Sequence, residues 1–182
     1  MVYSVSLAAN VVHSIDAYVL RTLVRRCNYN KENLTNTLNL IIAARLDDSD
    51  VVGYNTDNSI QCYELYKENK MVDTTHLHNI SYEEWLILLN SDSEYVNRVQ
   101  ELITTILKEE PFPIITVHDD FSCHAGNMNT LRYHYKEILA DIADSTIIDN
   151  VFGQIIGEDV IIERVGTGLG DLIRSNANYP IN

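Results

Sequence analysis

The sequence predicts an α+β protein that is mostly helical and contains one small antiparallel β-hairpin. Apolar residues recur at helical spacing over most of the chain. One β-branched run, Ile114–Val117, is followed closely by a second short segment, 121–124, that can return beside it. The 182 residues suffice for one ordinary domain with a buried core, and an apolar content of 46% is typical of globular proteins.

The first predicted helix spans residues 11–27. Ser14 is expected as its N-cap, and Asp16 lies in the first turn, where the helix dipole favours an acid. Its apolar face repeats every four residues: Ile15, Val19, Leu23 and Cys27. Arg21 and Arg25 are also four apart and share a neighbouring face, which spacing alone would make an ordinary solvated stripe.

Residues 28–110 are predicted to be mainly helical around a loop or hairpin at residues 51–59. Ser81 and Glu84 have the spacing of a capping box ahead of an apolar helix. An amphipathic helix follows over residues 93–109, and two prolines terminate it.

After those prolines we expect a strand at Ile114–Val117 and a second strand at 121–124, connected by residues 118–120. Helices are predicted over 128–143 and 146–156. Three glycines are then expected to break the chain before a short polar tail: Gly166, Gly168 and Gly170.

The charge is strongly negative and unevenly spread. A net charge of −13 argues against unassisted nucleic-acid binding. Residues 1–27 carry +2, whereas residues 28–110 carry −9 and residues 111–182 carry −6. Phosphate contacts are therefore expected first from the N-terminal arginines, and the acidic remainder should face solvent or a basic partner protein.

The chain shows no basic leader before an apolar stretch and no run long enough for a membrane span, so no membrane association is expected. Its three cysteines are far apart in the sequence, and no two of them have the short spacing of a paired-cysteine motif. This predicts reduced thiols in a reducing compartment.

The segment His118-Asp119-Asp120 is the main candidate site, because a strand turn holds a carboxylate with little freedom. Oxygen ligands suit Mg²⁺, and two such ions often assist nucleotidyl transfer. Asp119 is the expected ligand, Asp120 is a second ligand or a cap of the next turn, and His118 can bind a phosphate or the growing chain end. One carboxylate cannot hold two ions alone, so this is part of an active site; a plain surface turn would also explain the tripeptide.

Two segments resemble the single-subunit RNA polymerases of bacteriophages and mitochondria. Asn10-Val-Val-His-Ser-Ile-Asp-Ala-Tyr-Val-Leu-Arg21 is similar to the Asn-x-x-His-Ser-x-Asp-x-x-x-Leu helix that precedes their last catalytic motif. Ile115-Thr-Val-His-Asp-Asp-Phe-Ser-Cys-His-Ala125 resembles that motif, motif C, in the expected order along the chain. Residues 170–175 resemble more faintly the C-terminal foot of the family.

The resemblance implies a polymerase palm segment formed by residues 1–27 and 111–182, with 28–110 as an acidic insertion. It places Asp119 at the magnesium-binding aspartate and His118 beside it. It also places four residues of the first helix toward the template–product duplex or its phosphates: His13, Ser14, Arg21 and Arg25.

Motifs A and B of the family are missing, which predicts a polymerase divided between polypeptides. The expected partners are a second subunit carrying those motifs, the DNA template, nascent RNA and ribonucleoside triphosphates, in the cytoplasm of an infected bacterium. Two alternatives remain: a fragment of a family A-like DNA polymerase, whose motif C also begins His-Asp, and a non-catalytic acidic adaptor that recruits transcription factors.

Overall fold

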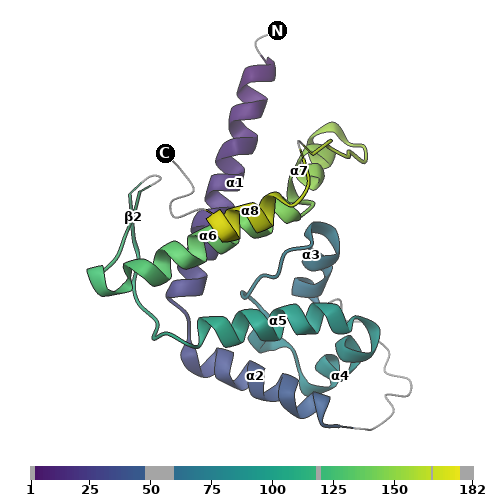
Figure 1. The fold of residues 1–182 in the computed structure, drawn as a ribbon. Coiled ribbons are helices and arrows are strands. Elements are labelled where there is room, and N and C mark those ends of the chain that lie inside the picture. Colours follow the sequence, from purple (N-terminus) through teal and green to yellow (C-terminus); the bar gives the residue numbers. More distant parts are fainter. Residues whose placement is uncertain (1–2, 48–59, 118–119, 165, 177–182) are drawn as a thin grey trace.

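The computed structural model describes residues 3–47, 60–117, 120–164 and 166–176. It is mostly helical with one two-stranded antiparallel sheet, which confirms the predicted α+β class (Figure 1). The helices are α1 (Tyr3–Cys27), α2 (Lys31–Arg45), α3 (Gln61–Asn69), α4 (Tyr82–Ser91), α5 (Ser93–Ile106), α6 (Met128–Asp144), α7 (Ile147–Ile156) and α8 (Leu169–Asn176). Two short 3-10 turns lie at Leu77–Asn79 and Ala125–Asn127. The strands are β1 (Ile115–Val117) and β2 (Asp120–Ser122).

Helix α1 starts earlier than predicted, and Ser14 is not its N-cap. The helix already includes Ala8 and Ala9, which have the highest helix propensity and carry it past the expected start. Ser14 Oγ donates a hydrogen bond to Asn10 O at 2.8 Å, the bond a serine makes inside a helix. The N-terminal half of α1 extends beyond the helices that pack on its other half (Figure 1).

One hydrophobic cluster draws its buried residues only from positions 34–106. Helix α5 supplies one continuous face to it: Tyr95, Val96, Val99, Ile103 and Ile106. Trp85 of α4 is fully buried in this cluster. Ser81 and Glu84 form the predicted capping box at the start of α4, so that prediction is confirmed. Helix α5 ends at Ile106, three residues before the predicted end.

A second cluster joins the C-terminal half of α1 to α6. Val19, Leu23 and Cys27 of α1 meet Leu131 and Ile138 of α6 in it. Met71, Phe112 and Ile147 add to this core from outside the two helices. Phe112 N donates to Cys27 O at 2.8 Å, so the chain returns beside the point where it leaves α1. The segment between them is an excursion with its own core, described here as the 28–111 excursion.

Helix α8 lies across α6 (Figure 1). Gly170 is the second residue of α8. Gly166 and Gly168 adopt positive φ, as chain-breaking glycines do. The prediction of a third break at Gly170 was wrong. A Cβ at Gly170 would overlap the Asp144 carboxylate, so its missing side chain serves the close approach of α8 to α6.

All three cysteines are free thiols, as predicted. Cys27 and Cys62 are buried, whereas Cys123 is half-buried. Burial, followed by the neighbouring Cys123, raises the pKa of Cys27 to about 12, which leaves it an unreactive thiol.

The capping box allows a matched test of local stability. Ser81→Ala removes the acceptor for Glu84 N, so we expect the free energy of unfolding to fall by about 1 kcal/mol. Ser91→Ala in the same helix removes only hydrogen bonds to the Ile87 and Leu88 carbonyls and should change stability far less. Urea denaturation of both variants measures the difference; equal losses would contradict a capping role.

Candidate functional site

The hairpin that carries the candidate site pairs Ile115 with Ser122, Thr116 with Phe121 and Val117 with Asp120. His118 and Asp119 follow Val117 in the sequence and lie outside the described residues. Asp120 was predicted in the connection between the strands, but it is the first residue of β2. Antiparallel pairing with Val117 takes its backbone into the sheet and leaves its side chain exposed.

The base of the hairpin is anchored to the second cluster. The Phe121 ring lies 5.6 Å from the Tyr135 ring of α6, centroid to centroid. Ile114 and Cys123 pack partly against the same cluster. Because side chains alternate along a strand, Asp120 points to the face opposite Phe121. The anchored aromatic therefore directs the neighbouring carboxylate away from α6.

Strand β1 is apolar and yet exposed along its whole length. Ile115 is 67% exposed and Val117 is 59% exposed. A strand with apolar side chains normally has at least one face buried against the rest of the protein. Apolar strands that remain exposed promote association with other chains. The described part of this chain leaves that surface uncovered.

The four helix residues predicted to face nucleic acid lie on one side of α1. Their positions span roughly 120° of the helix circumference at 3.6 residues per turn: His13, Ser14, Arg21 and Arg25. The first three are exposed, and Arg21 has no ion-pair partner within the described ranges. Arg25 is half-buried and pairs with Asp73, with Nη1 3.0 Å from Oδ2. The charge of Asp73 would compete with a phosphate for Arg25.

The third arginine of α1 is structural. Arg26 is only 3% exposed, and its Nη2 lies 2.9 Å from Asp141 Oδ2 of α6. The sequence placed Arg26 in a basic N-terminal segment available to phosphates. Its burial removes it from that role and makes it part of the core.

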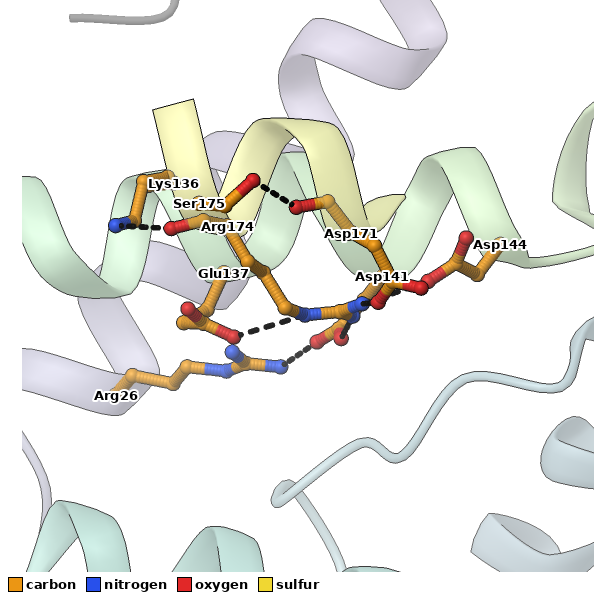
Figure 2. Close-up of polar contacts among 8 residues, drawn as sticks. All are labelled: Arg26, Lys136, Glu137, Asp141, Asp144, Asp171, Arg174 and Ser175. Carbon is orange, nitrogen blue, oxygen red and sulfur yellow. Dashed lines mark hydrogen bonds and ion pairs between the residues drawn. The ribbon is translucent and has the colours of Figure 1, made fainter. Parts of the chain in front are cut away.

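Asp141 also binds a second arginine, Arg174 of α8 (Figure 2). The Arg174 guanidinium donates to Glu137 at 3.2 Å, to Asp141 at 2.9 Å and to Asp144 at 2.8 Å. The three carboxylates lie at i, i+4 and i+7 on α6, so they form one row along the helix. Lys136 Nζ donates to the Arg174 carbonyl at 2.9 Å and holds the same turn. We call these residues with Arg26 the arginine–carboxylate network.

The network borders a cleft of about 1400 Å³ between α5 and the α6–α8 pair. Charged residues of both signs line it, including Arg45 and Arg98 from the excursion side and Glu137 from α6. Neither this cleft nor the network was predicted from the sequence. The i, i+4, i+7 row of acids on α6 was a visible signal, but nothing in the sequence joined it to Arg26 or Arg174.

His134 is buried beside this network. Burial, followed by the positive charge of Arg26, lowers its pKa to about 4. The imidazole is therefore neutral at physiological pH, and the Tyr133 ring lies edge-on at 5.3 Å. This histidine is therefore a buried neutral side chain of α6.

The described part of the hairpin offers one candidate ligand for a magnesium ion. Asp120 offers an exposed carboxylate on the hairpin, and its oxygens suit Mg²⁺. No group of three or more His, Cys, Asp or Glu side chains among the described residues is arranged to hold a metal ion.

A scan against protein-family models and a search of curated proteins both give no match. Among the described helices, none has the length and apolarity needed to cross a bilayer.

The shared carboxylate of the network is open to a direct test. Asp141→Asn removes the charge that faces the buried Arg26, so we expect a loss of about 2 kcal/mol in the free energy of unfolding. Glu94→Gln removes an exposed pair with Arg98 on α5 and should cost less than about 0.5 kcal/mol. Equal small losses in chemical denaturation would show that the network contributes little to stability.

The buried His134 predicts a dependence of stability on pH. Its folded pKa lies below its unfolded value of 6.5, so the unfolded state takes up the proton first as the pH falls. Stability from this group is complete above pH 6.5 and decreases toward pH 4, by an amount on the order of 3 kcal/mol.

His134→Gln removes this titration, so its unfolding free energy should fall less steeply between pH 6.5 and 4.5 than that of the unsubstituted protein. His78→Gln is the matched control, because His78 is exposed. Parallel pH profiles for the unsubstituted protein and His134→Gln would refute the assignment of a buried neutral imidazole.

Proposed function

We propose that this chain is one subunit of a bacteriophage-type DNA-dependent RNA polymerase and that it contributes a metal-binding aspartate to an active site shared with a second chain. The main support is spatial. The helix that carries the His13 motif and the hairpin that carries the motif C-like segment contribute to one hydrophobic cluster, although about a hundred residues separate them in the sequence.

The excursion accounts for that separation. Phe112 returns beside Cys27, so the 28–111 excursion leaves and rejoins the fold at one place. Its separate core lets it be present without disturbing the packing of α1 on α6. These features support the interpretation of residues 1–27 and 111–182 as a palm segment and of 28–110 as an insertion.

Two observations support a partner chain. Ile115 and Val117 leave an apolar strand surface uncovered, which a second subunit can bury. The described part of the hairpin supplies a single carboxylate, Asp120, whereas a two-metal reaction needs ligands for two ions. The proposed partner carries motifs A and B together with most of the basic DNA channel, consistent with the net charge of −13 on this chain.

The proposed chemistry is template-directed RNA synthesis from ribonucleoside triphosphates in the cytoplasm of an infected bacterium. The 3′ hydroxyl of the nascent RNA attacks the α-phosphate, and pyrophosphate leaves. Bound Mg²⁺ supplies charge neutralisation for this transfer. Asp119 and Asp120 hold the ion, and His118 hydrogen-bonds a phosphate or the chain end. His13, Ser14 and Arg21 orient the template–product duplex, so the contribution of this chain is positioning and electrostatic stabilisation.

The deciding experiment uses the chain reconstituted with its second subunit. Asp119→Ala should lower RNA synthesis at least about a hundredfold, because a charge-stabilising ligand is lost, while DNA binding by the complex is retained. Glu94→Gln, an exposed carboxylate on α5, is the matched control and should leave synthesis unchanged.

Unchanged transcription by Asp119→Ala would leave the acidic adaptor as the better interpretation. Incorporation of deoxyribonucleotides in preference to ribonucleotides would favour the family A-like DNA polymerase. Tight binding of duplex DNA by the isolated chain at physiological salt would contradict the division of labour between the two subunits.

A further inference from the structure

Helix α8 contacts α6 without burying its own apolar side chains. Leu169 is 56% exposed and Leu172 is 55% exposed. Ile173 is half-buried, and none of these three residues forms or packs against either hydrophobic cluster. Among the described residues of α8 only Gly170 is buried, and it has no side chain. Hydrophobic burial therefore contributes little to holding this helix on α6.

One arginine supplies the strongest contacts between the two helices. The Arg174 guanidinium points from α8 toward α6 and forms ion pairs with three carboxylates in one row: Glu137, Asp141 and Asp144 (Figure 2). The Arg174 side chain is 33% exposed, and the three carboxylates are between 22% and 46% exposed. Because water and dissolved ions reach these groups, salt screens their attraction.

The rest of the arginine–carboxylate network is shielded from solvent. The side chain of Arg26 is 3% exposed, and it pairs with the other carboxylate oxygen of Asp141. Salt screens such a buried pair much less than an exposed one. The network thus has a buried part that joins α1 to α6 and a solvent-accessible part that joins α8 to α6. Asp141 keeps Arg26 as its partner if Arg174 leaves.

Two exposed glycines lie immediately before α8. Gly166 has φ +111° and Gly168 has φ +72°, both in the region that favours glycine. A Cβ at either position would have no heavy atom within 4 Å beyond its chain neighbours, so nothing packs closely against this part of the chain. The backbone can therefore turn at these two residues without disturbing a neighbouring element.

We infer that α8 is a salt-sensitive latch: a helix that is held on α6 mainly by Arg174 and detaches, with Gly166 and Gly168 as its pivot, while the rest of the fold stays intact. Arg174 lines the cleft together with Glu137 and Asp144. Its release leaves those two carboxylates without an ion-pair partner among the described residues, so it makes the α6 wall of the cleft more negative. The inference does not depend on the proposed function, because it uses neither the hairpin nor the exposed residues of α1.

The test measures hydrogen exchange of the full chain by mass spectrometry at two salt concentrations. Raising NaCl from about 0.01 M to about 1 M shortens the Debye length from about 30 Å to about 3 Å. Backbone amides of residues 169–176 should then exchange at least about tenfold faster, because a detached helix of eight residues is not stable in water. Amides in the centre of α6 should keep their exchange rates within about twofold.

Two variants should release α8 by different routes. Arg174→Met removes the ion pairs but keeps a long side chain, so α8 should exchange fast at both salt concentrations. Gly170→Ala places a methyl group where the Asp144 carboxylate lies, and it should give the same fast exchange although Arg174 is retained. Arg98→Met is the matched control: it removes an exposed ion pair on α5 and should leave the exchange of α8 and its salt response unchanged.

The inference would be overturned by equal protection of α8 at low and high salt, or by protection that persists in Arg174→Met. It would also be overturned if α6 lost protection together with α8 at high salt, since α8 would then open only with the whole fold.

Discussion

The ion pair between Arg26 and Asp141 is the constraint on which the arrangement of the C-terminal half depends. A guanidinium that is 3% exposed must keep a carboxylate partner, since an unpaired buried charge is far costlier than the pair. The other carboxylate oxygen of Asp141 forms an ion pair with Arg174, and that arginine also pairs with Glu137 and Asp144. Three helices distant in sequence are thereby held in one orientation, with a precision that apolar packing alone does not supply.

This orientation matters for the hairpin. Helix α6 carries both the carboxylate row and Tyr135, which packs on Phe121 of β2. Because α1 is fixed to α6 by Arg26 and by the second cluster, the exposed residues of α1 and the hairpin share one support. Rigid helices are better supports than loops for groups that must act together. Under the proposed function, this shared support is what positions the nucleic-acid helix relative to the metal-binding hairpin.

The sequence was sufficient for the elements whose signals are local. The capping box at Ser81, the apolar face of α5 and the β-branched strand at Ile115 depend on neighbours within a few residues. The sequence did not predict the features that depend on contacts between residues distant in the chain. Gly170 resembles a chain break until α8 is placed against Asp144. Arg26 resembles a phosphate-binding arginine until α6 covers it, because no local pattern distinguishes a buried cation from an exposed one.

The hydrogen bond between Phe112 N and Cys27 O has a consequence for modularity. Two chain ends that meet in space can be spliced by a few residues at little cost in closure entropy. A shortened protein running from α1 directly into the hairpin is therefore topologically possible. Two contacts between the excursion and the rest of the fold would be lost in such a protein. Met71 contributes a buried side chain to the second cluster, and the Asn69 carbonyl accepts a hydrogen bond from the Thr146 amide. The excursion thus has its own core but also helps to stabilise the rest of the fold.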